Sequence, residues 1–238
     1  MAGIKTFILA GGLGTRLRSK ISDLPKSMAP VAGRPFLEWQ LMALKEQGFT
    51  DVVLCVGYLA EKIIDYFGDG SKFGMNIDYS IEREPLGTAG AIRNASKFVD
   101  STFLLLNGDT FFDVDYRGLL EFHEAKDVML SLSLIMAEDV SRYGSVAVDI
   151  NNRVVGFKEK QASSQGFGYI NAGVYAAEPS ILNYIAPQKA VSLENNVIPT
   201  IMETGRVYGY ISDGYFIDIG TPESYEVAQK FFERYHDF

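Results

Sequence analysis

Short apolar runs alternate with helix-like segments through the first half of the chain, and this alternation constrains the fold more than any other feature. Residues 4–10, 51–57, 76–81 and 102–109 carry strand-sized apolar runs, and helix-like segments at 34–48, 60–68 and 87–99 separate them;. Strands that alternate with helices form right-handed βαβ units, in which helices cover both faces of a parallel sheet. The sequence therefore predicts an α/β fold with a mostly parallel sheet.

The pattern changes after about residue 136, where we expect a smaller mixed β region. Strands on either side of Asn151-Asn152 predict a hairpin, followed by a strand at 168–177, a short helix at 195–205 and one or two strands at 207–220;. A closing helix at 221–235 would have Thr221 as its N-cap and Pro222 at its first position;. With no repeat or low-complexity linker, we expect one domain over 1–238, with halves at about 1–136 and 137–238.

The composition indicates a core-forming protein with an acidic surplus. The 238 residues are 47% apolar, and 22 Lys and Arg against 30 Asp and Glu give a net charge of −8. This balance argues against non-specific nucleic-acid binding, which needs a basic face. No apolar run is long enough to span a bilayer, so we expect no membrane partner. The single cysteine, Cys55, lies in an apolar run and predicts a buried thiol in a reducing cytoplasm;.

A glycine-rich loop follows the first strand, in the stretch FILAGGLGTRL. Glycine leaves backbone N–H groups uncovered, so such a loop can lie against a large anion. The loop is not a Walker A motif, and Leu17 stands where a dinucleotide fingerprint has its third glycine;. A plain turn between strand and helix is the alternative interpretation. A cluster of cations nearby favours a polyphosphate site instead: Arg16, Arg18, Lys20 and Lys26;.

Two aspartates at strand ends predict a magnesium site. Asp109 ends the strand at 102–109, on the same sheet edge as the glycine loop, and Asp218 ends a later strand;. Mg²⁺ prefers one or two protein carboxylates together with phosphate oxygens and water. Turn formation or helix capping is the alternative role for each.

Three further segments suggest ligand contacts. In EPLGTAGAI the backbone at Pro85–Thr88 would lie against a base, and Glu84 would accept from the N1–H and N2–H₂ donors of guanine. In GFKEK and YINAG, Lys160 could hold a phosphate while Glu159 and Asn171 bind sugar hydroxyls, although surface salt bridges and sheet packing explain these segments equally well. We expect His123 and His236 at the surface, since neither has metal-ligand spacing;.

Eight motifs in order make the chain similar to the sugar-1-phosphate nucleotidylyltransferases over nearly its full length. They are LAGGLGTRLR, LPKSMAPVAGRPFLEW, EPLGTAGAI, LNGDTFF, RYGSV, FKEK, INAGVY and FIDIGTPESY. Within the family, SDLPKSMAP, YSIEREPLGTAGAI and GYFIDIGTPESY most resemble the guanylyltransferase branch that uses D-glycero-α-D-manno-heptose 1-phosphate. The chain departs from the family pattern at Ser19, Ser27 and Gln161, where proline is usual, but no charged group is lost.

The resemblance implies a Rossmann-like nucleotide-binding core over about 1–136, a sugar-binding half over about 137–238, and dependence on Mg²⁺. It assigns Arg16 and Lys26 to the reacting phosphates, and Asp109 and Asp218 to the metal. The nucleotide would contact Leu9, Gly11, Gly12, Gly14, Thr15, Glu84, Pro85, Gly87 and Thr88. The sugar phosphate would contact Gly144, Glu159, Lys160 and Asn171.

The implied reaction joins GTP, or another NTP, to a sugar 1-phosphate for cell-surface polysaccharide synthesis and releases pyrophosphate. A phosphate monoester is largely ionised at neutral pH, so its direct attack on the α-phosphorus needs no general base. The alternatives are the same chemistry on mannose 1-phosphate with GTP, or on N-acetylmuramate or another sugar 1-phosphate with UTP. A further alternative is a non-catalytic regulatory subunit that binds nucleotide sugars. The enzyme would be cytoplasmic and could form a homodimer.

Overall fold

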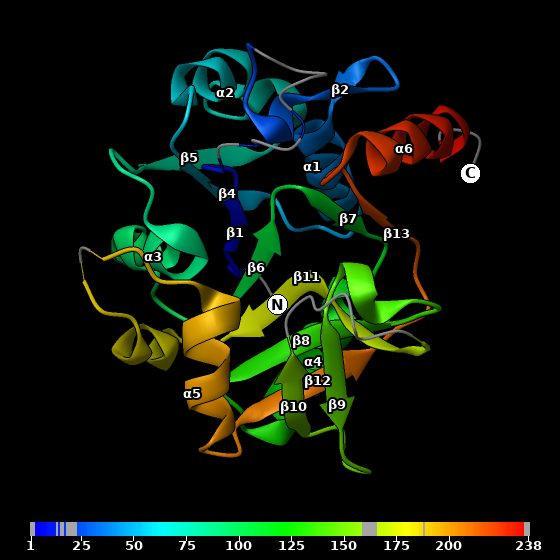
Figure 1. Cartoon of the computed structure of the whole chain (residues 1–238). Helices are drawn as coiled ribbons and strands as arrows, with labels where there is room; N and C mark the ends of the chain where they lie inside the picture. The colour runs from blue at the N-terminus through cyan, green and yellow to red at the C-terminus, as the bar shows by residue number, and fades with distance from the viewer. Residues whose placement is uncertain are drawn as a thin grey trace.

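Nine strands form one twisted sheet in the computed structural model, which describes residues 3–12, 14, 17, 23–158, 166–187 and 189–235. Figure 1 shows this sheet running through the molecule, with helices packed on both sides. The strands of the sheet are β1 (Thr6–Leu9), β4 (Asp51–Val56), β5 (Asn76–Ile81), β6 (Phe103–Asn107), β8 (Leu130–Ala137), β9 (Ser145–Val148), β10 (Val154–Lys158), β11 (Gly168–Ala177) and β12 (Val207–Ile211).

The first half of the chain supplies the parallel part of the sheet, in the order β6-β1-β4-β5. Phe7 of β1 is in register with Val53 of β4 on one side and with Leu105 of β6 on the other, and every pair in this part is parallel. All four strands therefore end at the same edge of the sheet. The predicted α/β fold with a mostly parallel sheet is confirmed.

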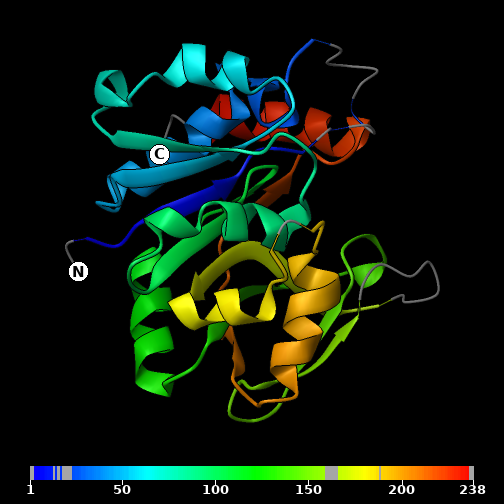
Figure 2. The same ribbon diagram turned by 90° about the vertical axis from the view of Figure 1, so that its left-hand side faces the viewer.

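The sheet separates two apolar clusters, as the alternation of side chains along its strands requires. Ile8 of β1 faces a cluster that includes residues of α1 (Phe36–Glu46), α2 (Ala60–Phe67) and α4 (Tyr116–Lys126). Phe7 faces the opposite cluster, which includes residues of α3 (Gly87–Asn94) and α5 (Ile198–Met202). Figure 2 shows α1 and α2 on one side of the sheet and α3 and α5 on the other.

The second half of the chain extends the sheet with mixed pairings. β11 is antiparallel to β6 along one side and to β8 along the other, and β12 continues beyond β8 in a parallel pairing. The predicted hairpin forms between β9 and β10, and Asn152 in its turn has a φ of 66°. The register of β11 shifts between Asn171 and Tyr175, around Gly173 with a φ of 75°. Such a bulge bends a strand and redirects its side chains, often beside a functional site.

A small antiparallel ribbon brings the end of the chain back to the first half. It consists of β7 (Thr110–Phe112) and β13 (Phe216–Asp218), in which Asp218 is in register with Thr110. The closing helix α6 (Pro222–Tyr235) packs Phe232 against Trp39 of α1 in a stacked contact. The Oγ1 atom of Thr221 accepts from the N–H of Ser224, as the N-cap prediction requires.

Two local predictions were wrong in detail. The first helix begins at Phe36 rather than at residue 34, because Arg34–Pro35 form the strand β3 against β2 (Pro30–Val31). His123 does not lie at the surface: its side chain is 2% exposed, because it is on the inner face of α4 and contacts Ser131 of β8. In the described part of the chain, no helix has the length and apolar character needed to cross a membrane.

Candidate active site

A cavity of about 490 Å³, here called cavity 1, lies at the edge where the parallel strands end. Three turns form its walls: the glycine loop after β1, the segment between β5 and α3, and the turn after β6. Ligands of open α/β sheets bind beyond the carboxyl ends of the strands, so the cavity stands where this fold places a ligand. Its described lining residues are Leu9, Ala10, Gly11, Gly12, Gly14, Lys26, Ser27, Glu82, Pro85, Gly87, Thr88, Ala91, Asn107, Gly108 and Asp109.

Close packing excludes a side chain at one position of the glycine loop and at one position of the neighbouring turn. A Cβ atom on Gly14 would lie 2.9 Å from Cβ of Lys26, and the φ of Gly14 is 58°, a value that L side chains rarely adopt;. A Cβ atom on Gly108 in the neighbouring turn would lie 2.5 Å from the carbonyl oxygen of Leu9. The bare backbone therefore forms the floor of cavity 1. Thr15 and Arg16, which the sequence assigns to the same site, lie outside the described residues.

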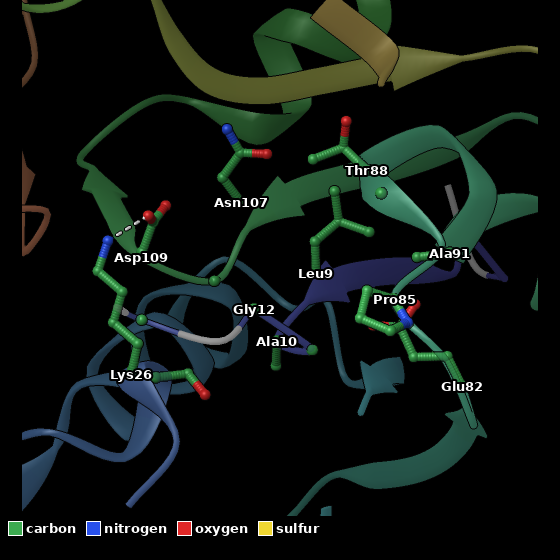
Figure 3. A pocket seen from close by; sticks show the side chains of 15 residues that line it. Leu9, Ala10, Gly12, Lys26, Glu82, Pro85, Thr88, Ala91, Asn107 and Asp109 are labelled. Atoms are coloured by element: carbon green, nitrogen blue, oxygen red, sulfur yellow. Dashed lines mark hydrogen bonds and ion pairs between the residues drawn. The ribbon is translucent and has the colours of Figure 1, made fainter. Parts of the chain in front are cut away.

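The turn before α3 forms one end of cavity 1, and Figure 3 shows Pro85, Thr88 and Glu82 there. Gly87 has a φ of 72°, and a Cβ atom at this position would lie 2.6 Å from the carbonyl oxygen of Val191. Glu84 is exposed and is absent from the described lining, whereas Glu82 lines the cavity beside Gly11 and Gly57. Sequence reasoning named Glu84 and missed Glu82.

The carboxyl group of Glu82 is half-buried against the glycine loop. Burial raises the pKa of Glu82 above its ordinary value, although a hydrogen bond from the N–H of Leu86 acts in the opposite direction. A carboxylate kept partly from water forms stronger hydrogen bonds with ligand donors than an exposed one. Glu82 is therefore suited to accept hydrogen bonds from a ligand in cavity 1.

Lys26 and Asp109 face each other at the other end of cavity 1 (Figure 3). The Nζ atom of Lys26 lies 2.5 Å from Oδ2 of Asp109, and the two side chains are 11% and 43% exposed. Lys26 begins a short 3₁₀ helix after the glycine loop, and Asp109 belongs to the turn after β6. The cavity thus has the Lys26–Asp109 ion pair at one end and, at the other, the apolar surface of Pro85 and Ala91 beside the Glu82 carboxyl group.

A second cavity of about 390 Å³, here called cavity 2, adjoins the first. Asn107 and Asp109 line both cavities, so the charged end of cavity 1 opens toward cavity 2. Asn171 lines cavity 2 at the bulge of β11. The other described residues of its lining are Thr110, Ser141, Arg142, Tyr143, Phe157, Glu194, Phe216, Asp218, Gly220 and Thr221.

Asp109 and Asp218 lie at the same end of the β7–β13 ribbon and both line cavity 2. The N–H of Ile219 donates to the carbonyl oxygen of Asp109 at 3.0 Å, which fixes the two segments side by side. Burial disfavours ionisation of Asp218, but hydrogen bonds from Tyr143, the Gly220 N–H and Ser224, together with the Arg142 charge, outweigh it. The pKa of Asp218 is accordingly below its usual value. The structure therefore holds a second anionic carboxylate beside Asp109.

A family model described as nucleotidyl transferase matches residues 5–234. The chain belongs to the nucleotidyl transferase family. The predicted family membership is confirmed.

Relatives with the same name in two organisms match nearly the whole chain. The D-glycero-α-D-manno-heptose 1-phosphate guanylyltransferase of Aneurinibacillus thermoaerophilus is 42% identical over 98% of this chain and 100% of its own length. The protein of the same name from Campylobacter jejuni is 45% identical over 93% of this chain and 97% of its own length. Among solved structures, HddC from Yersinia pseudotuberculosis has a TM-score of 0.85 and 39% identity over 96% of this chain and 99% of its own. HddC has also been solved in complex with GMP-PN.

The site of this nucleotidyl transferase includes residues that the sequence did not single out. Arg142 and Tyr143 line cavity 2, and both contact Oδ2 of Asp218, at 3.6 Å from an Arg142 guanidinium nitrogen and 2.7 Å from the Tyr143 hydroxyl. Burial and this carboxylate raise the pKa of Tyr143, so its hydroxyl remains a donor. The motif RYGSV was visible in the sequence, but only Gly144 was taken from it.

Three of the predicted sugar-phosphate residues are not placed at cavity 2. Gly144 is buried with a φ of 83° and follows Tyr143, but it is absent from the described lining. Glu159 and Lys160 lie outside the described residues. Their contacts with substrate therefore stay predictions.

The described residues contain no cluster of three or more His, Cys, Asp and Glu side chains that could hold a metal ion. The candidate metal ligands in the described part of the site are therefore the two carboxylates of Asp109 and Asp218. Two carboxylates at one cavity edge suit Mg²⁺, which takes its remaining ligands from phosphate oxygens and water.

Proposed function

We propose that this chain transfers the GMP group of GTP to D-glycero-α-D-manno-heptose 1-phosphate and releases pyrophosphate. One observation supports this most directly: two cavities, each large enough for one substrate, meet at Asp109 with Lys26 beside it. The names of the relatives supply the base and the sugar.

The polarity of cavity 1 favours one orientation of GTP. The base would lie at Pro85, Thr88 and Glu82, and the triphosphate would run along the glycine loop toward Lys26. Backbone N–H groups and a lysine suit phosphate oxygens, whereas the apolar surface of Pro85 and Ala91 suits the face of a base. The α-phosphate would then lie close to the junction of the two cavities.

Glu82 is the residue we assign to guanine recognition. Guanine has neighbouring N1–H and N2–H₂ donors, and a carboxylate can accept from both. Uracil and adenine do not have this donor pair, so a half-buried Glu82 would favour GTP over UTP and ATP;. Glu84 stays a candidate for the same role from the sequence, although its side chain is exposed.

The chemistry is a direct displacement at phosphorus. The phosphate oxygen of the sugar 1-phosphate forms a bond to the α-phosphorus of GTP, while the bond from the α-phosphorus to the bridging oxygen breaks and pyrophosphate leaves with the electron pair. Phosphate monoesters have a second pKa near ~6, so no general base is needed. Lys26 would stabilise the charge that develops at the reacting phosphates, and Arg16 and Lys160 have this task by sequence;.

Asp109 and Asp218 would hold Mg²⁺ at the junction, since both carboxylates reach cavity 2 and the pKa of Asp218 is lowered. Bound there, Mg²⁺ would offset the negative charge of the phosphates. Asp109 directly precedes β7 and Asp218 ends β13, so the pairing of these two strands and the bond from the Ile219 N–H to the Asp109 carbonyl fix their relative position.

The residues that line each cavity indicate which half of the chain binds which substrate. All described residues that line cavity 1 precede residue 110, whereas most of those that line cavity 2 lie between 141 and 221. We therefore infer that the first half binds the nucleotide and the second half binds the sugar phosphate, within one domain.

A substrate panel tests the proposal. Pyrophosphate release should be measured with GTP, UTP, ATP and dTTP against heptose, mannose, glucose and amino-sugar 1-phosphates, in Mg²⁺. We expect the highest kcat/KM for GTP with the heptose 1-phosphate. Highest turnover of mannose 1-phosphate with GTP, or of a sugar 1-phosphate with UTP, would reassign the substrate. Nucleotide-sugar binding without turnover of any pair would favour a regulatory subunit instead.

A further inference from the structure

Glu194 is the centre of a side-chain network that reaches both cavities. It lies in a π-helical turn, Leu193–Val197, and lines cavity 2. Helices of this type are rare and are often found at functional sites. Glu194 belongs to none of the motifs quoted above, and no sequence signal marked it.

The segment that carries Glu194 is docked onto the start of α3. The carbonyl oxygen of Val191 accepts from the N–H groups of Ala89 and Gly90, at 3.0 and 3.2 Å. In return, the N–H of Val191 donates to the carbonyl oxygen of Leu86 at 2.8 Å. These bonds join two parts of the chain about a hundred residues apart, and they leave the base-binding turn and the π-helical turn little freedom to move separately.

One oxygen of Glu194 is bonded toward the nucleotide cavity. Its Oε2 atom accepts from the hydroxyl of Thr88 at 2.7 Å, and Thr88 lines cavity 1. The same Thr88 hydroxyl accepts from the N–H of Leu193 at 2.7 Å. Ser192 also donates to Oε2 at 3.0 Å. The position of the Thr88 hydroxyl is therefore set by the Glu194 segment.

The other oxygen of Glu194 is bonded toward the sugar cavity. The hydroxyl of Tyr175 donates to Oε1 at 3.4 Å, and Nδ2 of Asn171 donates to the Tyr175 oxygen at 2.6 Å. Asn171 lines cavity 2, while Tyr175 is fully buried and is absent from the described lining of either cavity. Tyr175 thus acts only through its neighbours.

We propose that Glu194 is a positioning residue that aligns the nucleotide cavity with the sugar-phosphate cavity, through Thr88 on one side and Tyr175–Asn171 on the other. The inference rests on the proposed function, because it takes cavity 1 as the nucleotide site and cavity 2 as the sugar site. Through this network, one carboxylate holds a residue on the side of each cavity. Glu194 would thereby help to bring the attacking phosphate into line with the α-phosphorus, a placement on which displacement rates depend strongly.

The test compares the KM of each substrate across variants of the network. Glu194→Ala removes both arms and should raise the KM for GTP and the KM for the sugar 1-phosphate, each about tenfold. Tyr175→Phe removes only the sugar arm and should raise the sugar KM about fivefold, with the GTP KM unchanged. Glu194→Gln keeps an acceptor oxygen for Thr88 but sets an NH₂ donor against the donating Tyr175 hydroxyl, so it should restore most of the KM for GTP and little of the KM for the sugar 1-phosphate. Glu203→Ala, at an exposed glutamate just past α5, is the matched control and should change neither KM.

Two outcomes would overturn the inference. One is a Glu194→Ala enzyme that is folded by thermal unfolding and has only one KM changed, or none. The other is measured in the double variant Thr88→Val with Tyr175→Phe, a test that does not require Glu194→Ala to fold. The inference is overturned if the kcat/KM losses of the two single variants multiply in the double variant. If Glu194 links the two residues, the double variant loses less kcat/KM than the product of the single losses, whereas independent effects would multiply.

Failure of the proposed function is distinguishable from failure of this inference. A wild-type enzyme that turns over no NTP with any sugar phosphate contradicts the function. Calorimetric titration of GTP into wild type and Glu194→Ala still tests the nucleotide arm in that case, because GTP binding to cavity 1 needs no turnover. Equal affinities would then count against the role of Glu194.

Discussion

The ammonium group of Lys26 and the carboxylate of Asp109 lie 2.5 Å apart, and this contact joins the turn after the glycine loop to the turn after β6. Gln40, 2% exposed on α1, supports the Asp109 side, because its Nε2 atom donates to the carbonyl oxygens of Asn107 and Thr110 at 2.9 and 2.6 Å. Both charged groups are thus oriented toward the junction of the cavities before any substrate arrives.

Replacing Lys26 tests the proposed phosphate contact. Lys26→Met keeps the aliphatic stem that packs on Gly14 and removes the charge, so kcat should fall by about 10²–10³-fold, as is typical when a preorganised contact to the transition state is lost;. Lys62→Met, at an exposed lysine of α2 outside the described lining of both cavities, should retain wild-type turnover. Steady-state pyrophosphate release measures both. A Lys26→Met enzyme with most of its turnover would refute the role.

Replacing Asp218 tests the metal assignment. Asp218→Asn keeps an oxygen for the Gly220 N–H and for Ser224 but removes the negative charge, so the fold should persist. We expect kcat to fall by about 10²-fold or more and the Mg²⁺ concentration for half-maximal rate to rise. Asp213→Asn, at an exposed aspartate before β13, is the control of equal charge. An unchanged Mg²⁺ dependence in Asp218→Asn would show that the metal is held elsewhere.

Replacing Glu82 tests how the base is read. Glu82→Gln exchanges one acceptor oxygen for an amide donor, which opposes the guanine donors, and kcat/KM for GTP should fall by about 10–100-fold. The loss should be smaller with ITP, whose base has no N2 amino group. Glu84→Gln is the matched control, since the exposed Glu84 is absent from the described lining. If Glu84→Gln has the larger effect, the assignment from the sequence is the correct one.

The same residue predicts a pH effect on GTP binding. Because burial raises the pKa of Glu82, its carboxylate takes up a proton at a higher pH than an ordinary glutamate does. A protonated Glu82 accepts less well from guanine, so the dissociation constant for GTP should rise as the pH falls through this raised pKa. Calorimetric titrations between pH 7.5 and 5 would measure it. In Glu82→Gln the rise should be absent, and a rise of equal size there would assign it to another group.

His123 predicts a pH-dependent stability. Burial lowers the pKa of His123, although Glu178, whose Oε1 lies 3.2 Å from Nε2, acts in the opposite direction. The unfolded chain, with a histidine pKa near ~6.5, therefore binds a proton that the folded chain does not. Stability is complete above pH ~6.5 and falls as the pH drops through that value, by at most about 1.4 kcal/mol per pH unit.

Thermal unfolding between pH 7.5 and 5.5 measures this effect. His123→Gln should remove most of the decline in Tm over that range. The matched control is His236→Gln, at the other histidine of the chain, which the sequence places at the surface and which lies outside the described residues; it should leave the decline in place. A decline that survives in His123→Gln would assign it to a different group.

Most of the residues that the sequence grouped around the glycine loop and the turn before α3 do line cavity 1, because that cavity is built from local signals. Gly11, Gly14 and Pro85 stand in turns that follow strands, and Thr88 stands in the first turn of α3. Parallel strands that end at one edge bring these segments together. Asp109 and Asp218 were named for the same reason, as acidic residues that end strands. Asp109 and Asp218 are adjacent because β7 pairs with β13, and no local sequence pattern predicts this pairing.

The lining of cavity 2 was harder to predict, because long-range pairing builds it. Arg142 and Tyr143 reach Asp218 across some 75 residues of chain, and Glu194 reaches Thr88 across about a hundred. Glu82 and Glu84 differ by two positions at the end of β5, so alternation alone could not tell which of them faces cavity 1. His123 was placed at the surface because it has no metal-ligand spacing, whereas its burial comes from the packing of its helix on β8, where it contacts Ser131.

The pairing of β7 with β13 has a consequence for the synthesis of this protein. A growing polypeptide that has emerged only as far as residue 215 already contains every described residue that lines cavity 1, yet it lacks Asp218. Under the proposed function, such an unfinished chain would bind GTP but would not yet catalyse transfer of its GMP group. Competence for chemistry would arrive only with the last tenth of synthesis, when Asp218 pairs into place.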